Sequence, residues 1–126
     1  MRRNIHTDKA PKAIGPYAPG VACGDLLFVS GQIALDPATN ALVAGDIRAQ
    51  TRRALQNLKA VIEAAGFSLA DTVKCTCYLQ NMDHFAEFNA VYAEFFPQQP
   101  PARSTFQVAA LPLGALIEIE TIAVRK

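Results

Sequence analysis

The chain has 126 residues, of which 51% are hydrophobic and 18% are charged. This length suits one domain, residues 1–126, and the apolar content excludes a disordered or purely solvating segment. Twelve basic and eleven acidic residues leave a net charge of +1, which excludes long-range attraction to nucleic acid or to an anionic membrane.

The N-terminal part of the chain predicts an irregular arm followed by a strand. Five proline and glycine residues within residues 1–20 indicate an extended, turn-rich arm laid over the body of the protein. A further early strand around Val21 stays an open alternative. Residues 26–33 are a short apolar run rich in β-favouring side chains, which predicts a strand, and residues 36–40 supply a turn.

The hydrophobic pattern becomes helical over residues 46–65. Asp46 is placed to act as the N-cap, and Gly66 follows the last periodic residue as a C′ glycine. The side chains predicted to face the core are Ile47, Thr51, Leu55, Leu58, Ile62 and Ala65. Ser68 and Asp71 have the spacing of a capping turn before the next strand.

The middle of the chain predicts a half-covered strand and an aromatic helix. Alternation over residues 73–79 places Val73, Cys75, Cys77 and Leu79 on the core face. The next helix is capped near Asp83 and stops at Pro97, because proline cannot continue a helix. Its predicted buried stripe consists of Phe85, Phe88, Tyr92 and Phe95. We interpret this stripe as core rather than as a cofactor-binding feature.

The last segments complete the predicted fold. Residues 103–109 and 116–124 have the character of strands, joined through residues 111–114. The order of elements predicts an α+β fold, an α/β layer in which two helices cover one face of a mixed sheet. The other face is too apolar to meet water, so we expect self-association to cover it in a closed homo-oligomer.

The cysteines and the N-terminus bear on the compartment. Cys23, Cys75 and Cys77 are odd in number and cannot form a closed disulfide framework. The Cys75-x-Cys77 spacing, with only two histidines in the chain, does not fit the usual zinc ligand sets. We therefore expect buried reduced thiols and no metal. Because the sequence contains neither an apolar run of signal-peptide length near its start nor a membrane-spanning stretch, we expect a cytoplasmic location and no membrane partner.

Familiar catalytic signatures such as GxGxxG, GxxxxGK[ST], HExxH and GxSxG are absent. The remaining candidates are charged residues near the C-terminus. The strand period places Arg103 and Thr105 on one face, and it aligns Glu118 and Glu120 with Ile122 and Val124. Charge on a face that otherwise favours burial is expensive unless it is paired or lies at a cleft. One reading is a structural cross-strand ion pair between Arg103 and one of the two glutamates.

The functional reading assigns chemistry to the same residues. Arg103 would hold a substrate carboxylate through its planar guanidinium. A nearby glutamate, its pKa raised by partial burial, would move protons or activate a water. Imine hydrolysis suits such a site, because the imine carbon is already electrophilic and needs orientation and proton transfer rather than a cofactor.

Several blocks in the correct order make the chain resemble the RidA proteins of the Rid family, also called the YjgF or endoribonuclease L-PSP family. The C-terminal blocks are Pro101-Ala102-Arg103-Ser104-Thr105-Phe106, Ala109-x-Leu111 and Ile117-Glu118-Ile119-Glu120. The other blocks are Ala13-Ile14-Gly15-Pro16-Tyr17, Val29-Ser30-Gly31-Gln32-Ile33, Ala64-Ala65-Gly66 and Phe88-Asn89-x-x-Tyr92. The resemblance covers essentially the whole chain.

The resemblance implies a chorismate-mutase-like fold assembled as a homotrimer, with sites in clefts between subunits. It also implies deamination of reactive enamines and imines, such as 2-aminoacrylate, 2-iminopropanoate and 2-iminobutanoate, to 2-oxo acids and ammonia without a cofactor. By motif, Arg103 would bind the substrate carboxylate and Glu118 would position and activate the attacking water. Glu120 would be structural.

The resemblance also implies roles for residues around the substrate. Gly31 and Thr105 would offer backbone groups, Tyr17 would close the pocket from the arm, and Ser30 and Asn89 would lie at its edge. Some family members carry cysteine where this chain has Thr105. A backbone role tolerates threonine, whereas any function that needs the sulfur would be missing here.

Three alternatives stay open. One is ribonuclease activity or translational inhibition, which the near-zero net charge and the lack of tryptophan and of a basic-aromatic platform do not favour. The second is a non-enzymatic module or holdase that binds small acids. The third is a pathway-specific deaminase for a particular unsaturated amino acid such as 2-aminomuconate.

Overall fold

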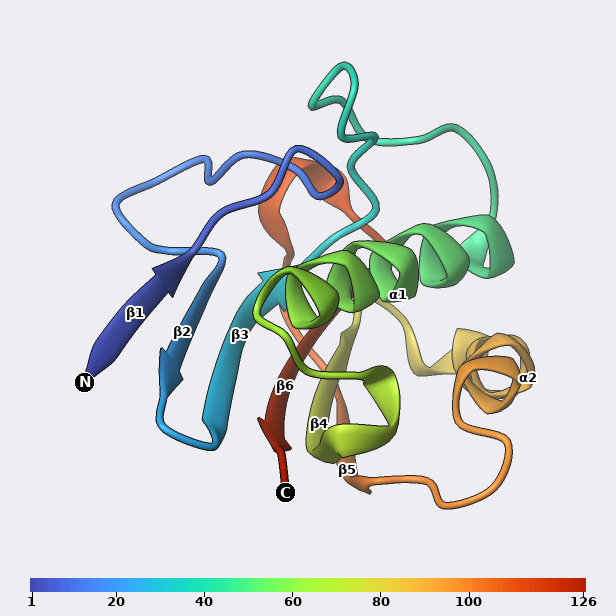
Figure 1. Ribbon diagram of the computed structural model, residues 1–126. Coiled ribbons are helices and arrows are strands. Elements are labelled where there is room, and N and C mark those ends of the chain that lie inside the picture. Colours follow the sequence, from blue (N-terminus) through green and yellow to red (C-terminus); the bar gives the residue numbers. More distant parts are fainter.

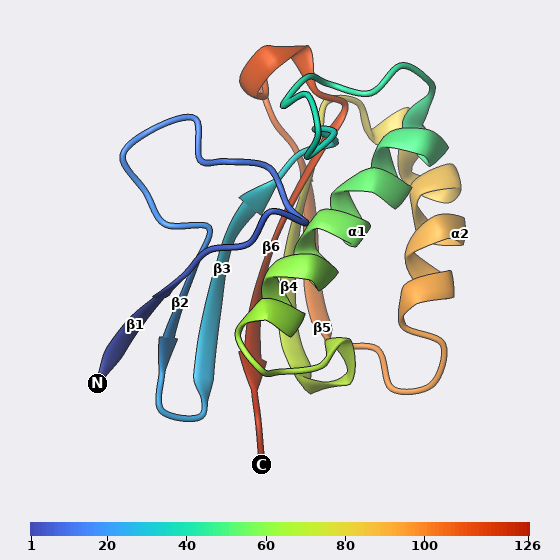
Figure 2. The same ribbon diagram turned by 45° about the horizontal axis from the view of Figure 1, so that its top comes forward.

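Six strands form one mixed sheet, and both α-helices pack against the same face of it (Figure 2). The computed structural model describes all residues, 1–126. The strands are β1 (Arg2–Ile5), β2 (Gly20–Cys23), β3 (Leu26–Gln32), β4 (Thr72–Leu79), β5 (Ala102–Gln107) and β6 (Ile117–Val124), and the helices are α1 (Ile47–Ala64) and α2 (Phe85–Phe95). Their order in the sheet is β1-β2-β3-β6-β4-β5, and only the β4–β5 pair is parallel (Figure 1). The predicted α+β layer is thereby confirmed. Neither α-helix is long and apolar enough to cross a membrane.

The N-terminal arm contains one strand that the sequence prediction missed. Strand β1 pairs antiparallel with β2 at the edge of the sheet, whereas the rest of the arm, up to Pro19, is irregular. A short, polar edge strand shows little alternation of apolar and polar residues, because it lacks a neighbouring strand on one side and is exposed to water. The alternative strand around Val21 is confirmed as β2, and the strand predicted to reach residue 109 ends at Gln107.

Both ends of α1 follow the sequence signals. The Asp46 carboxylate accepts a hydrogen bond from the Ala49 N–H at 3.0 Å. Gly66 adopts φ +85°, and the N–H groups of Gly66 and Phe67 donate to the carbonyls of Glu63 and Ile62. This pattern is a Schellman ending, in which a left-handed glycine satisfies the last helical carbonyls. All six side chains that were predicted to face the core from this helix are buried.

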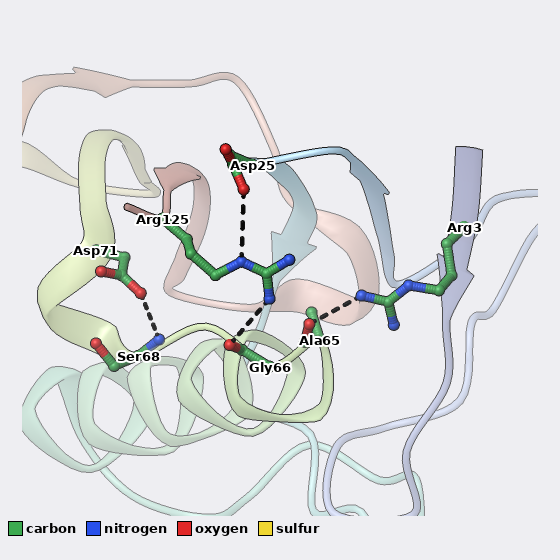
Figure 3. A network of polar contacts seen from close by, with 7 residues as sticks. All are labelled: Arg3, Asp25, Ala65, Gly66, Ser68, Asp71 and Arg125. Atoms are coloured by element: carbon green, nitrogen blue, oxygen red, sulfur yellow. Dashed lines mark hydrogen bonds and ion pairs between the residues drawn. The ribbon is translucent and has the colours of Figure 1, made fainter. Parts of the chain in front are cut away.

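Two arginines reach the C-terminal end of α1 from opposite ends of the chain (Figure 3). Arg3 donates from Nη2 to the Ala65 carbonyl at 2.9 Å, and Arg125 donates from Nη1 to the Gly66 carbonyl at 3.3 Å. Arg125 also forms an ion pair with Asp25, in which its Nε lies 3.8 Å from Oδ1 of the aspartate. Because the C-terminal end of a helix carries partial negative charge, both arginines stabilise it and connect α1 to the ends of β1 and β6.

The start of β4 corrects one prediction. Asp71 accepts a hydrogen bond from the Ser68 N–H at 2.8 Å, which forms the expected turn before the strand. Val73, however, is 46% exposed, so its predicted place on the core face is wrong. The register between β4 and β6 shifts between Thr72 and Lys74, and Thr72 is buried instead. A β-bulge reverses the alternation of side chains, which a regular period cannot anticipate.

The core lies between the helices and the sheet. From α2, Phe88 and Tyr92 are buried, whereas Phe85 and Phe95 are half-buried and pack against the same cluster. A short 3₁₀ turn, Met82–His84, precedes this helix. The thiols of Cys75 and Cys77 are buried in the core, as predicted, but Cys23 is exposed, so the expectation of three buried thiols is wrong for that residue.

The opposite face of the sheet carries several apolar side chains and is uncovered in the single chain. Leu26 and Phe28 of β3 stand opposite Val124 and Ile122 of β6. Leu26, Phe28, Val124 and Phe106 of β5 are each between 40% and 53% exposed. Regular alternation along these strands therefore leaves exposed apolar side chains on this face, which they share with polar residues of β4 and β6 such as Lys74, Thr76 and Glu120.

Candidate functional site

A β-bulge shapes the sheet where the Val29-Ser30-Gly31-Gln32 block lies. Val29 pairs with Thr121 and Gln32 pairs with Ile119, so β3 holds one residue more than β6 over this stretch. Ser30 is fixed by the arm, because its hydroxyl donates to the Ala18 carbonyl at 2.6 Å and its N–H donates to the Pro19 carbonyl at 2.9 Å. The bulge thus brings the arm and the edge of β3 together at one place.

Glu118 of β6 lies beside this bulge, on the open face of the sheet. Its carboxylate fills the space next to Gly31, which has no side chain to occupy it. Glu118 is half-buried, and this burial raises the pKa of its carboxyl group above the ordinary value, with the negative charge of Glu120 as the second cause. A carboxyl group with a raised pKa can both accept and return a proton closer to neutral pH than an exposed glutamate can.

The arm, the bulge and Glu118 enclose a pocket of about 360 Å³. Of the predicted site residues, it brings together Tyr17, Ser30, Gly31 and Glu118. Tyr17 is 46% exposed, and its hydroxyl accepts a hydrogen bond from the Ile14 N–H at 3.3 Å. The Tyr17 ring is therefore held at the pocket by its own arm. We call these four residues and the pocket the glutamate half-site.

The same pocket includes residues that the sequence analysis did not assign to a site, among them Lys12, Gln32 and Pro112. Lys12 directly precedes the Ala13-Ile14-Gly15-Pro16-Tyr17 block, so its position next to that block was the sequence signal that could have identified it. Its N–H donates to the Asn40 side chain at 3.0 Å, which ties the arm to the loop after β3. Glu120 also lines the pocket and is exposed, and it accepts a hydrogen bond from the Tyr78 hydroxyl at 3.4 Å.

Arg103 lies elsewhere, among aromatic rings of α2. Its guanidinium carbon is 4.7 Å from the ring centre of Tyr92, 5.0 Å from that of Phe88 and 5.6 Å from that of Phe85. These distances are those of cation–π contacts. The residue is half-buried and forms no ion pair within the chain. Its positive charge is therefore available to an external anion.

Two other predicted site residues accompany Arg103. Thr105 follows it on the same face of β5, opposite Cys77, and Asn89 belongs to the helix that supplies the rings. The Thr105 Oγ1 and the Asn89 Oδ1 are both buried without a hydrogen-bond partner. Buried polar atoms normally have partners, so these two atoms are exceptions, as is the Tyr92 hydroxyl. Arg103, Thr105 and Asn89 form what we call the arginine half-site.

The two half-sites lie on opposite faces of the sheet. Arg103 pairs with Cys75, whose side chain faces the helices, whereas Glu118 pairs with Tyr78, whose side chain faces the open side. Strand β4 also separates β5 from β6. The cross-strand ion pair of Arg103 with Glu118 or Glu120 is therefore wrong as a structural reading. One chain does not bring the arginine and the glutamate to the same place.

The aromatic residues around Arg103 show what the sequence reading left out. The stripe of α2 was interpreted as core, and Phe88 and Tyr92 are indeed buried. The same rings also contact Arg103, which the pattern of a single helix cannot reveal because the arginine comes from a different element. The signal was the spacing of the stripe, since residues three and seven positions apart present their rings on one helix face.

Comparisons with known proteins agree over the whole chain. Residues 7–125 match the family described as Endoribonuclease L-PSP. A Salmonella typhimurium protein named 2-iminobutanoate/2-iminopropanoate deaminase is 48% identical over 129 residues, covering 100% of both chains. Other relatives of similar identity carry only the name RutC family protein.

Solved structures give the same result for the fold. A crystal structure of a Thermotoga maritima protein is 53% identical and superposes with a TM-score of 0.98, covering 100% of this chain and 99% of that one. The structure of Escherichia coli TdcF with bound serine is 44% identical, with a TM-score of 0.95, and covers 98% of this chain and 99% of that one. The identity is high enough for the family as well as the fold to be shared.

Proposed function

The chain belongs to the Endoribonuclease L-PSP family, which is also the RidA or YjgF family, and we propose that it hydrolyses small 2-imino acids and their enamine tautomers to 2-oxo acids and ammonia. The substrates would be 2-aminoacrylate with 2-iminopropanoate, and 2-iminobutanoate. The name of the Salmonella relative supports this reaction, and the serine bound to TdcF supports a small amino-acid-like ligand. The free guanidinium of Arg103 suits the carboxylate that these substrates share.

The site would be completed between subunits of a homotrimer. The observation that carries this proposal is the position of Arg103 and Glu118 on opposite faces of one sheet. A second copy that packs on the open face can set its arginine half-site against the glutamate half-site of the first. A closed ring of three copies then satisfies every half-site, as a heterologous interface with closed symmetry requires.

The proposed reaction uses the two half-sites in sequence. Arg103 of one subunit fixes the substrate carboxylate, so that the C=N carbon faces the pocket beside Glu118 of the neighbour. The Glu118 carboxylate takes a proton from a water molecule as the water oxygen bonds to that carbon and the C=N π electrons move to the nitrogen. Glu118 then gives this proton to the nitrogen, which leaves a neutral amino alcohol. Glu118 next takes the hydroxyl proton, the oxygen electrons form the carbonyl of the 2-oxo acid, and the C–N bond breaks with its electron pair on the nitrogen. The proton passes from Glu118 to that nitrogen, so that ammonia leaves. No cofactor takes part in these steps, because the imine carbon is already electrophilic.

The direct test is an assay in which an amino-acid oxidase generates 2-iminopropanoate in situ and the disappearance of the imine is followed. We expect the parent protein to accelerate hydrolysis, and we expect Arg103→Ala to lower kcat/KM by at least about tenfold, since a charge-assisted contact contributes about 1.5–3 kcal/mol. For Glu118→Gln we expect substrate binding to survive and turnover to fall. An Arg103→Ala protein as active as the parent would leave that residue a structural role only.

Subunit mixing tests the shared site. Arg103→Ala and Glu118→Gln chains, refolded together in equal amounts, should regain activity, because about a quarter of the interfaces then join an intact arginine half-site to an intact glutamate half-site. The matched control mixes Glu118→Gln with Gly31→Ala, which both damage the glutamate half-site, and this mixture should be no more active than the average of the two variants alone. Equal recovery of activity in both mixtures would contradict a site shared between subunits. So would a lack of recovery in both mixtures when the parent protein, refolded in the same way, is active.

The description of the family as endoribonuclease supplies the second candidate function. It predicts RNA cleavage that accompanies the purified oligomer and disappears in Glu118→Gln. The same variants also separate an enzyme from a binding module for small acids. A protein that needs Arg103 for ligand binding and shows no catalytic loss in Glu118→Gln would be a binding module.

A further inference from the structure

The surroundings of Arg103 are unusual for an arginine that awaits an anionic ligand. Phe85, Phe88 and Tyr92 lie three and four residues apart on α2, so their rings follow one another along one face of the helix. Neighbouring ring centres are 6.3 Å and 5.5 Å apart. The guanidinium carbon of Arg103 is within 5.6 Å of all three ring centres. We call these three rings the aromatic wall.

No acidic group neutralises Arg103 in the chain. The ion pairs of the chain involve Arg52 and Arg125 instead. On the core side, the charge of Arg103 acts on the Cys75 and Cys77 thiols of β4 and on the Tyr92 hydroxyl. Burial raises the pKa of Cys75 to about 11, raises that of Cys77 to about 12 and raises the pKa of Tyr92 as well, so all three groups are uncharged at neutral pH. The rings are thus the groups that hold the cation.

We propose that the aromatic wall positions Arg103 for carboxylate binding, so that Phe85, Phe88 and Tyr92 are positioning residues of the arginine half-site. This inference rests on the proposed function. It assigns a role to Phe88 and Tyr92, for which the resemblance implied none although they belong to a family block, and to Phe85, which lies outside that block. The negative faces of the rings attract the planar guanidinium and restrict its rotamers. The N–H groups at its edge stay free for a planar carboxylate. A flexible lysine would lose this alignment, which accounts for an arginine at residue 103.

The cost of immobilising a side chain gives the expected size of the effect. A long, flexible side chain that has to be ordered when a ligand binds weakens binding by the entropy it loses. If the wall holds Arg103 in advance, removing one ring should raise the Kd for a carboxylate by about three- to tenfold. The wall would contribute to ground-state binding of the carboxylate as well as to the transition state, so KM should rise while kcat changes little.

The test replaces single rings by leucine, which keeps apolar bulk and removes the π face. Phe88→Leu removes a fully buried ring, and Phe85→Leu removes a half-buried ring at a smaller cost in stability. The matched control is Phe67→Leu, because the Phe67 ring is also buried and also contacts an arginine, Arg125, at 4.5 Å, outside both half-sites. Calorimetry with pyruvate, the 2-oxo acid product, measures carboxylate binding without turnover.

We expect the Kd for pyruvate and the KM for 2-iminopropanoate to rise in Phe85→Leu and Phe88→Leu and to stay at parent values in Phe67→Leu. A merely structural role would produce the same changes in all three variants, in proportion to their loss of thermal stability. If Phe88→Leu does not fold, Phe85→Leu decides. Parent-like Kd and KM in the folded wall variants, with an active parent, would overturn the inference and leave the proposed function intact.

A double-mutant cycle checks that the wall acts through Arg103. In the background of Arg103→Lys, Phe85→Leu should cause little further rise in the Kd for pyruvate, because the aligned guanidinium is already gone. Additive effects would show that the ring acts on the ligand by another route and would contradict the positioning role. A parent protein that neither binds pyruvate nor hydrolyses the imine would instead overturn the proposed function, and this inference with it.

Discussion

The carboxylate of Glu118 occupies the space that a side chain at Gly31 would fill. A Cβ atom on Gly31 would lie 2.5 Å from Oε2 of Glu118, 2.8 Å from its Cδ and 3.0 Å from its Cγ. These separations are far inside van der Waals contact, so any larger residue at this position must displace the glutamate. Gly31 is therefore a steric requirement of the half-site as well as a possible source of backbone contacts.

We expect Gly31→Ala to lower kcat/KM by about ten- to a hundredfold, because a displacement of the glutamate by about 1 Å is enough to misalign the attacking water. The half-buried glutamate can swing aside, so the free energy of unfolding should change by less than about 1 kcal/mol. Imine-hydrolysis kinetics and urea unfolding measure the two effects. In a Glu118→Ala background, which has no side chain to displace, Gly31→Ala should cause no further loss, and an equally large second loss would contradict the steric explanation.

The raised pKa of Glu118 sets the acid side of the pH profile. Glu118 has to be deprotonated to accept a proton from water, and an ordinary glutamate has a pKa of about 4.3. Because burial raises the pKa of Glu118, kcat/KM should start to fall, as the pH is lowered, at a higher pH than that value. This limb should be missing from the residual activity of Glu118→Gln. An unchanged acid limb in that variant would assign the titration to another group.

The raised pKa of Glu118 also predicts how the free energy of unfolding depends on pH. The effect has the opposite sign to that of a carboxylate stabilised by an ion pair. The folded-state pKa of Glu118 lies above the unfolded-state value, so stability is highest below the unfolded pKa and falls as the pH rises through the folded one. Glu118→Gln should therefore be more stable than the parent at pH 7, with the difference vanishing near pH 3. Urea unfolding at both pH values measures this, and a variant that is less stable at pH 7 would contradict the burial penalty.

Asn57 fixes the segment that forms part of the pocket. It is fully buried, and its Nδ2 donates to the carbonyls of Ile33 and Leu35 at 3.0 Å and 2.9 Å. Its Oδ1 accepts from Arg53 at 3.0 Å. The Ile33 carbonyl also accepts from the Leu35 N–H at 2.9 Å, so Asn57→Ala leaves the Leu35 carbonyl without its donor, and we expect the free energy of unfolding to fall by about 1–3 kcal/mol. In contrast, Gln56→Ala on the exposed side of α1 should stay within about 0.5 kcal/mol of the parent. An Asn57→Ala loss as small as that of the control would mean that water replaces the amide.

The open face of the sheet supplies the fifth prediction. Phe28 is 44% exposed there, opposite Ile122. If this face is buried between subunits, Phe28→Glu places a charge in an apolar interface and should convert the oligomer to monomers with loss of deaminase activity. Sedimentation equilibrium measures the assembly. Gln56→Glu adds the same charge to the outer surface of α1 and should leave the assembly unchanged, whereas an oligomeric Phe28→Glu protein would place the interface elsewhere.

Local patterns in the sequence were sufficient to predict both α-helices and most of the strands. Helix α1 could be predicted with both ends, because Asp46 and Gly66 act on groups within a few residues of themselves. The alternation in the last strand also correctly placed Glu118 on a face with Ile122, since alternation is a property of one strand. The spaced motif blocks were sufficient to predict the family, because they depend only on the identity and order of residues along the chain.

The tertiary structure decided how these elements meet. That β4 lies between β5 and β6, and that the helices cover the face carrying Arg103, follow from the packing of the whole chain. The bulge that exposes Val73 and the burial of Asn57 likewise depend on neighbours distant in sequence. Period and propensity specify which side chains share a face of one element, but they contain no information on which face another element will cover. Arg103 and Glu118 could thus be chosen from the sequence, while their separation onto two faces could only be seen in the folded chain.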